Sequence, residues 1–497
     1  MAAAGLAGRF LRRACVTLVT ASAVLPIAPP GKPGPRVSVV ETSADLRQAL
    51  APQAPVRMRP GAAGSGPVIT LDAGTRYQRF RAVGAAMTDS SAWLIQNELP
   101  ASTRDWLMGR LFGRTGLHLG LLRVPMGASD FSAQGVPYTY DDLPAGQSDP
   151  TLAHFSIAHD RAYILPALHE ALAENPGALL LASPWSPPGW MKDTGVLSNP
   201  ADLVGTLQPS SYAPLATYFV KFLQAYRAAG MPIWGVTPQN EPGQNTTYPG
   251  MNLAAAGETA FITQDLAPAL HAAHLPTRIY GYDNNWYGAG IGYAYALALG
   301  PAARDLSGIA SHCYFGTAGE ISGLHRVAPG LDQVVSECSP GSIAFTTSQI
   351  EIAATRNWAS AVTLWNLALD PAGGPVQPPN YGCRGCTGVV TVDPVAHTVR
   401  LSRDYYQLGQ FSKYVAPGAV RIASNTLVHD HYFYPSGLIT TQGVDDVAFR
   451  NPDGTRVLIA YADTAAPVSF GVRDGSEGFR YRLSPGATAT FTWKPAR

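Results

Sequence analysis

Eight short apolar runs, separated by segments of helical periodicity, constrain the fold of this chain more than any other feature. Strands of a parallel sheet are buried on both faces, so they consist of nearly continuous apolar residues. The intervening segments place apolar residues at three- and four-residue steps, most clearly in 212–229, as amphipathic helices do. Repeated strand–helix units predict an α/β fold, a (β/α)8 TIM barrel. The runs are 80–87, 119–126, 178–184, 233–237, 278–282, 308–314, 333–336 and 360–365.

An open, doubly wound sheet is the competing architecture for this pattern. Dinucleotide-binding sheets of that type carry a Gly-x-Gly-x-x-Gly loop after the first strand. No such loop follows 80–87, which favours the closed barrel. The helices that we expect include 104–112, 161–173, 212–229 and 348–356.

The pattern changes after about residue 415. Residues 447–450 and 456–461 flank a turn at 451–454, which predicts a β-hairpin. Residues 487–493 alternate strictly between apolar and polar, as a strand with one buried face does. We therefore expect a barrel over 77–414 and a small antiparallel β domain over 415–497. The segment 29–76 has no helix of its own and is expected to add strands to that β domain.

The first 28 residues have the layout of a secretory signal peptide. Three arginines precede an apolar stretch, 14–27, that is short for a membrane span. An uncleaved anchor helix is the alternative, and the prolines at positions 26, 29 and 30 disfavour it. We expect export and an extracellular protein without stable membrane insertion. The net charge of +1 and the lack of a basic stripe argue against a nucleic-acid partner.

The exported chain would keep four cysteines, Cys313, Cys338, Cys383 and Cys386. Neither a second pair nor histidines at metal spacing accompany Cys383 and Cys386, so a zinc site is not expected. In an exported protein this pair is a candidate disulfide. Cys313 and Cys338 lie in apolar runs and are expected to be buried free thiols.

Two glutamates follow predicted strands, Glu241 after the fourth and Glu337 after the seventh. The reacting groups of (β/α)8 enzymes gather at the C-terminal strand ends. A pair of carboxylates there suits glycoside hydrolysis, in which one protonates the leaving oxygen and the other attacks the anomeric carbon. Aromatic and polar side chains at the other strand ends would bind sugar faces and hydroxyls: Arg123, Trp185, Asn240, Asp283, Asn284, His312, Tyr314, Trp365 and Asn366.

Each of these residues also has a purely structural interpretation. A glutamate at a strand end can be a surface ion-pair partner, Trp185 and Trp365 can be packing residues, and His312 can be a satisfied core histidine. Glu337 follows an apolar run, where a carboxylate is costly to bury without a partner. The prediction of a glycosidase therefore depends on the whole set in strand order.

From about Tyr77 almost to its C-terminus the chain resembles glycoside hydrolase family 30. The similar segments are 83–89, 122–126, 129–132, 182–188, 237–242, 365–369, 411–414 and 484–486. The resemblance implies a (β/α)8 barrel joined to a β-sandwich built from both chain ends, and a retaining mechanism. By motif position it implies that Glu241 is the acid/base and that Glu337 is the nucleophile. Asn240 would bind the 2-hydroxyl, and Arg123 would balance the nucleophile's charge.

The resemblance also implies a pocket for the terminal sugar. Asp130, Trp185 and Trp365 match residues that bind this sugar, and Tyr248, His312, Tyr314 and Asn380 match residues that line the same pocket. The chain departs from the family in two motifs: Ala82-Val-Gly84 stands for Gly-Phe-Gly, and His312-Cys-Tyr314 for His-Trp-Tyr.

The expected activity is hydrolysis of a β-glucosidic bond, glucosylceramidase-like, by double displacement. The substrate would be a carbohydrate or glycolipid, without a metal, a cofactor or an inferred protein partner. An endo-β-1,6-glucanase, a xylosidase or a fucosidase on the same scaffold is the alternative. A catalytically inactive carbohydrate-binding protein is disfavoured, because both carboxylates are present.

Overall fold

The computed structural model describes residues 34–198, 205–244, 246–286, 288–343, 345–377, 383, 385–427 and 443–495. The expected signal peptide and Asn380 lie outside these ranges. Within them, no helix combines the length and the apolar character needed to cross a membrane. Residues 34–497 make up one compact unit.

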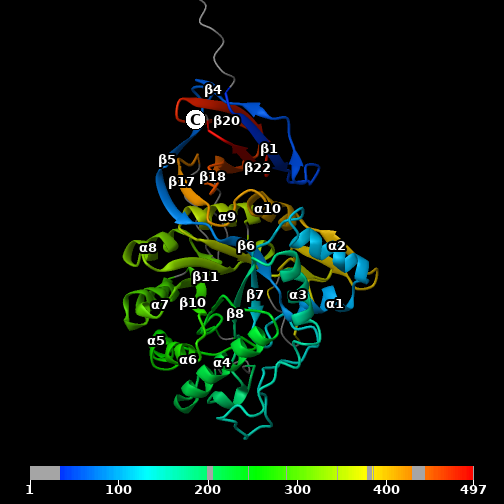
Figure 1. Ribbon diagram of the computed structural model, residues 1–497, viewed down its shortest axis with the longest axis vertical. Helices are drawn as coiled ribbons and strands as arrows, with labels where there is room; N and C mark the ends of the chain where they lie inside the picture. Colours follow the sequence, from blue (N-terminus) through cyan, green and yellow to red (C-terminus); the bar gives the residue numbers. More distant parts are fainter. Residues whose placement is uncertain are drawn as a thin grey trace, which may run out of the picture. The chain divides into compact units, whose positions relative to one another are not determined.

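Eight parallel strands close into a barrel in sequence order, with the last, β13 (Ala361–Leu364), paired to the first, β6 (Ala82–Ala86). Figure 1 labels β6, β7, β8, β10 and β11 of this barrel. Every strand coincides with one of the predicted apolar runs, so the barrel prediction is confirmed. The strands are β6 (Ala82–Ala86), β7 (Leu121–Pro125), β8 (Leu179–Ser183), β9 (Gly235–Val236), β10 (Arg278–Trp286), β11 (Gly308–Gly316), β12 (Asp332–Glu337) and β13 (Ala361–Leu364).

Helices surround the barrel. The helix α4 (Tyr212–Ala228) buries Leu215, Phe219, Phe222 and Tyr226 at the predicted spacing. A capping box between Thr346 and Gln349 sets the start of α9 (Thr347–Arg356). The other helices are α1 (Asp89–Asn97), α2 (Ala101–Leu111), α3 (Ile164–Glu174), α5 (Ala255–Ala260), α6 (Ala267–Ala272), α7 (Gly288–Leu299), α8 (Gly319–Val327), α9 (Thr347–Arg356) and α10 (Arg403–Ser412).

One apolar layer of the barrel determines where polar side chains can lie. Leu121, Leu181 and Val334 belong to a separate buried cluster together with Ala82, Tyr280, Ala310 and Ala361. Side chains two residues apart on a strand share a face, so the next inward positions are Arg123, Ser183, His312, Ser336 and Thr363. These polar residues are all buried and lie toward the C-terminal strand ends. The apolar layer therefore closes the barrel beneath a polar site.

The remaining strands form a sheet built from both chain ends, around its own apolar core. The predicted hairpin is present, with Arg450 paired to Arg456. The strands of this second sheet are β1 (Arg36–Thr42), β2 (Ala51–Pro52), β3 (Val56–Arg57), β4 (Arg59–Pro60), β5 (Val68–Arg79), β17 (Val420–Ser424), β18 (Gly443–Arg450), β19 (Arg456–Asp463), β20 (Val468–Asp474), β21 (Glu477–Leu483) and β22 (Thr488–Trp493). A small third sheet holds β14 (Ala368–Leu369), β15 (Val390–Asp393) and β16 (Thr398–Leu401).

One pairing corrects the prediction of an antiparallel domain. The strands β5 and β20 run parallel, with Val68 opposite Gly471, whereas the other pairs in this sheet are antiparallel. The two strands come from opposite ends of the chain. No hairpin joins them, so sequence proximity does not impose their relative direction.

The structure also corrects the prediction for Cys313 and Cys338, which form a disulfide with their Cα atoms 5.3 Å apart. The strands β11 and β12 are neighbours, and His312 pairs with Glu337 in their register. The residue after each member of this pair is a cysteine, Cys313 within β11 and Cys338 directly after β12, so the two cysteines face each other at a distance suited to a disulfide. Cys383 and Cys386 form a second disulfide.

Candidate active site

Arg123, on β7, lies at the centre of the polar site and is fully buried. Its guanidinium donates to Oε2 of Glu337, to Oδ1 of Asn240 at 2.7 Å and to Oδ2 of Asp283 at 2.8 Å. Burial opposes its charge, but the charges of Asp283 and Glu337 outweigh burial and raise the pKa of Arg123. Arg123 therefore brings three strand ends together by charge-assisted bonds.

Asp283 is a completely buried carboxylate on β10. Burial alone would raise its pKa, but Arg123 and the hydrogen bond from His312 lower it well below the ordinary value. Asp283 is therefore an anion whose two oxygens are saturated by donors. Besides Arg123, these are Ser183 Oγ at 3.1 Å, Thr237 Oγ1 at 2.7 Å, Ser336 Oγ at 2.5 Å and His312 Nε2 at 3.1 Å.

His312 lies between two carboxylates. Its Nδ1 is 2.9 Å from Oε1 of Glu241, and its Nε2 faces Asp283. Burial lowers the pKa of a histidine, but here the charge of Glu337 and the hydrogen bonds to Asp283 and Glu241 raise the pKa to about 10. The imidazole is therefore protonated at neutral pH and donates through both nitrogens.

Glu337 ends β12 and has two separate donors. Tyr314 Oη donates to Oε1 at 2.9 Å, and Arg123 donates to Oε2. Burial raises the pKa of Glu337, while the positive charges of His312 and Arg123 act in the opposite direction. The position of both carboxylate oxygens is thus fixed.

Glu241 follows β9 in an unusual backbone conformation, with φ at 44°. Its amide donates to the carbonyl of Asp283 at 3.0 Å, which holds this left-handed residue in place. Non-glycine residues seldom adopt such angles, and those that do are concentrated at functional sites. The conformation places the Glu241 side chain against His312.

The two glutamates are close neighbours. One carboxylate oxygen of Glu241, one of Glu337 and a ring nitrogen of His312 lie within 4.8 Å of one another. This spacing would also accommodate a metal ion. However, a protonated imidazole has no free lone pair, so the donor set suits proton transfer better than metal binding.

Aromatic side chains border the carboxylates. Trp185 and Trp365 stack with centroids 5.0 Å apart, and the guanidinium of Arg123 lies 4.7 Å from the Trp185 ring. Tyr248 packs against this cluster. Asp130 is buried nearby, and burial together with the charges of Glu337 and Glu241 raises its pKa well above the ordinary value. These groups offer apolar faces and hydrogen-bonding groups, the two kinds of surface that a sugar ring presents.

The comparisons with known proteins agree with this arrangement. Residues 80–415 match the model of the glycosyl hydrolase family 30 TIM-barrel domain, and residues 418–491 match that of the family 30 β-sandwich domain. The chain belongs to glycosyl hydrolase family 30. The family 30 assignment confirms the resemblance, the fold class and the expected glycosidase activity.

Family 30 members of two kinds are similar to this chain. An endo-1,6-β-D-glucanase of Neurospora crassa is 34% identical over 84% of this chain and 86% of its own. The lysosomal acid glucosylceramidase of Mus musculus is 30% identical over 87% of this chain and 84% of its own. A solved endo-β-1,6-glucanase superimposes with a TM-score of 0.79 at 28% identity, over 93% of this chain and all of that one.

The structure brings together nearly all the site residues expected from the sequence. Arg123, Asn240, Glu241, His312, Tyr314 and Glu337 belong to one hydrogen-bonded network, in which Asp283 joins Arg123 to His312. Asp130, Trp185, Tyr248 and Trp365 lie around it. Asn380 lies outside the described residues.

Sequence reasoning underestimated Asp283. The sequence predicts it only as one of the strand-end residues that bind sugar hydroxyls, whereas protein donors occupy both of its oxygens and it anchors Arg123 and His312. Asn285 was also overlooked: its amide lies 3.5 Å from Glu241 and its side-chain oxygen accepts the backbone N–H of Tyr314 at 2.9 Å. For Asp283 the sequence did carry a signal, because it is an acidic residue directly after the fifth apolar run, 278–282.

Proposed function

We propose that this enzyme hydrolyses β-glucosides with retention, with Glu337 as nucleophile and Glu241 as acid/base. The observation that carries the proposal is the separation of the two carboxylates, whose nearest oxygens lie within 4.8 Å. Retaining glycosidases hold the two groups roughly 5–5.5 Å apart, whereas inverting enzymes need roughly 6.5–9.5 Å to admit a water.

In the first step, the carboxylate of Glu337 attacks the anomeric carbon and forms a glycosyl ester. The bond to the leaving oxygen breaks, and that oxygen takes the proton of Glu241. Arg123 and Tyr314 hold the two oxygens of Glu337, so the attacking carboxylate needs little reorganisation.

In the second step, Glu241 takes a proton from water while the water oxygen attacks the anomeric carbon. The ester bond breaks and Glu337 returns to its carboxylate form. His312 holds Glu241 in position through both steps, because its protonated ring can donate to either form of the carboxyl group. Asp283 keeps His312 protonated and oriented.

The sugar in the pocket would be bound by residues around the two glutamates. We propose that Asn240 binds the hydroxyl next to the reacting carbon, and that Trp185, Trp365, Asp130 and Tyr248 bind the rest of the ring. For Asn380 we keep the role that the family resemblance implies, as a residue that lines the sugar pocket. The proposal also includes export directed by residues 1–28 as a signal peptide. The catalytic barrel would span 77–414, and the β-sandwich would consist of 29–76 and 415–497.

For the group beyond the cleaved bond, we propose β-1,6-glucan first. The relatives named endo-1,6-β-D-glucanase are 33–34% identical over three quarters or more of the chain, and a solved structure of that activity superimposes over 93% of it. Glucosylceramide is the second candidate, supported by the mouse enzyme at 30% identity.

A hydrolysis panel tests both. Purified enzyme is given an aryl β-glucoside, β-1,6-glucan, gentiobiose, glucosylceramide and xylan at matched molarity of the cleavable bond, with Glu337→Gln as the matched inactive control. We expect hydrolysis of the aryl glucoside and of β-1,6-glucan. Cleavage of glucosylceramide alone would replace the first candidate by the second. Cleavage of xylan alone would overturn both.

A further inference from the structure

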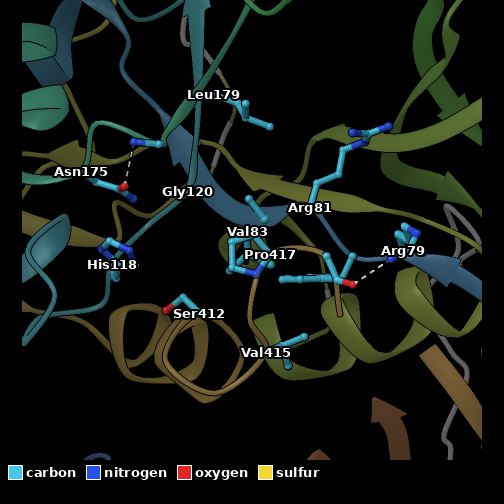
Figure 2. A pocket seen from close by; sticks show the side chains of 14 residues that line it. Arg79, Arg81, Val83, His118, Gly120, Asn175, Leu179, Ser412, Val415 and Pro417 are labelled. Atoms are coloured by element: carbon cyan, nitrogen blue, oxygen red, sulfur yellow. Dashed lines mark hydrogen bonds between the residues drawn. The ribbon is translucent and has the colours of Figure 1, made fainter. Parts of the chain in front are cut away.

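A cavity of about 450 Å³ lies at the end of the barrel opposite the glutamates. Figure 2 shows the residues that line it. Its walls come from the beginnings of three barrel strands: Ala82 and Val83 of β6, Gly120 just before β7 and Leu179 of β8. Glu241 and Glu337 follow the opposite ends of their strands, so the cavity is separate from the catalytic site.

The cavity occupies the junction between barrel and sheet. The chain crosses between the two parts twice, at Arg79–Phe80 and at Pro417–Gly418, and both crossings line the cavity. Two backbone hydrogen bonds join the crossings. The amide of Phe80 donates to the carbonyl of Ala419 at 2.7 Å, and the amide of Gly418 donates to the carbonyl of Phe80 at 2.8 Å. A bound molecule would therefore contact both connections at once.

The lining has the composition of a small-molecule site. Apolar side chains dominate, from Phe80, Val83, Leu179, Val415 and Pro417. Pockets that bind small molecules are usually about 300–1,000 Å³, mostly apolar, with a few polar groups that orient the ligand. The volume and the walls here suit a short aliphatic chain.

The charged side chains of the described lining are Arg79 and Arg81, both cationic, and none of the described lining residues is acidic. The imidazole of His118 also borders the cavity. Arg81 forms an ion pair with Asp332, with Nε and Oδ2 2.8 Å apart. Arg79 is exposed, and the bond described for its guanidinium is a long one, 3.5 Å, to the carbonyl of Gly418. His118 uses Nδ1 for the carbonyl of Phe112 at 3.0 Å, and Figure 2 shows its ring at the other end of the cavity from Arg79.

We propose that this cavity is a second, non-catalytic binding site for an aliphatic carboxylate of medium chain length. The alkyl chain lies against the apolar walls, and the carboxylate lies near the cationic border, with Arg79 as its main partner. By contacting both crossings, the ligand stabilises the junction between barrel and sheet. It does not compete with the glucoside, because the two sites are at opposite ends of the barrel.

Isothermal titration calorimetry with sodium octanoate and, separately, 1-octanol tests this site on the full-length enzyme. We expect one octanoate per chain with a dissociation constant below 1 mM, binding of octanol at least tenfold weaker, and a rise in Tm with octanoate. The KM for an aryl β-glucoside should not change at saturating octanoate. Absence of binding, or competition with the glucoside, would overturn the proposal.

Two variants locate the site. Leu179→Trp fills the cavity and should weaken octanoate binding at least tenfold, while aryl glucosidase activity stays within twofold of the parent. Arg79→Gln changes only an exposed side chain, so it remains informative if the first variant folds poorly. It should weaken octanoate severalfold and leave octanol unchanged. Unchanged octanoate affinity in Arg79→Gln would contradict the assigned carboxylate partner, and unchanged affinity in a folded Leu179→Trp would contradict the site itself.

Discussion

Nδ1 of His312 lies 2.9 Å from Oε1 of Glu241, and the same imidazole faces Asp283 through its other nitrogen. The charge on this ring joins Glu241, the proposed acid/base residue, to a buried anion. Because the imidazole lies on β11, between the strands that carry Asp283 and Glu337, its protonation affects the whole site.

The stability of the enzyme should decrease as pH rises through the titration of His312. The folded-state pKa of about 10 is above the usual value of 6.5, so the protonated ring contributes full stability below pH 6.5 and loses it as pH rises to 10. The contribution is on the order of 3–5 kcal/mol at most. Chemical denaturation from pH 6 to 10 should show this decrease, and His312→Asn should show a flatter profile. Parallel profiles for the two proteins would count against a charged His312.

Glu241 and Glu337 should respond differently to the same substitution. Glu337→Gln should lower kcat by at least about a thousandfold for every substrate, because no ester can form. Glu241→Gln should lower kcat/KM about 10²–10⁴-fold for poor leaving groups, and much less for a dinitrophenyl glucoside, whose departure needs no proton. Its kcat should be low for every substrate, because hydrolysis of the common glycosyl ester also needs Glu241 as base. Steady-state kinetics over a leaving-group series measures this. Equal sensitivity of the two variants to the leaving group would mean that the roles are assigned wrongly.

Asp283→Asn should impair catalysis, although Asp283 does not itself contact the substrate in the proposed mechanism. Arg123 and His312 would both lose their buried counter-ion, and removing one partner of a buried charge pair costs about 3–5 kcal/mol. We expect a lower Tm and a kcat reduced at least tenfold, with a shift of the alkaline limb of the pH–rate profile to lower pH as the pKa of His312 decreases. Asp332→Asn, at the other end of the barrel, serves as the control. A parental pH profile in Asp283→Asn would refute the proposed link to His312.

The disulfide between Cys313 and Cys338 should support the alignment of the site. Its cysteines directly follow His312 and Glu337 and are fully buried. Cys313→Ala combined with Cys338→Ala should lower kcat more than it raises KM, because it loosens the register of two strands that hold reacting groups. Kinetics and Tm measured together distinguish this from general destabilisation: a lower Tm with unchanged kcat at 25 °C would show that the bond has only a structural role.

Local patterns predicted the barrel and its glutamates because the necessary information is local. A strand buried on both faces is apolar over most of its length, as Leu180–Ala182 is in β8, and the polar residue after such a run lies at the strand end. Glu337 and Glu241 could therefore be placed without knowing which strands are neighbours.

The missed features depend on register between strands. Cys313 and Cys338 are 25 residues apart, and they pair because β11 and β12 align His312 with Glu337. The role of Asp283 arises in the same way, from donors on or directly after five other strands. The parallel pairing of β5 with β20 likewise joins distant segments. Side chains in one run do not determine such alignments.

Covalent trapping of the nucleophile tests the central claim most directly. An activated 2-deoxy-2-fluoro-β-glucoside should form the glycosyl ester but hydrolyse slowly, because the fluorine destabilises the positive charge that develops in both steps. Peptide mapping by mass spectrometry should find one fluoroglucosyl adduct per chain, on Glu337 within the peptide that contains Ser336 and Cys338. An adduct on a different carboxylate, or turnover without any adduct and with inversion at the anomeric carbon, would contradict the account.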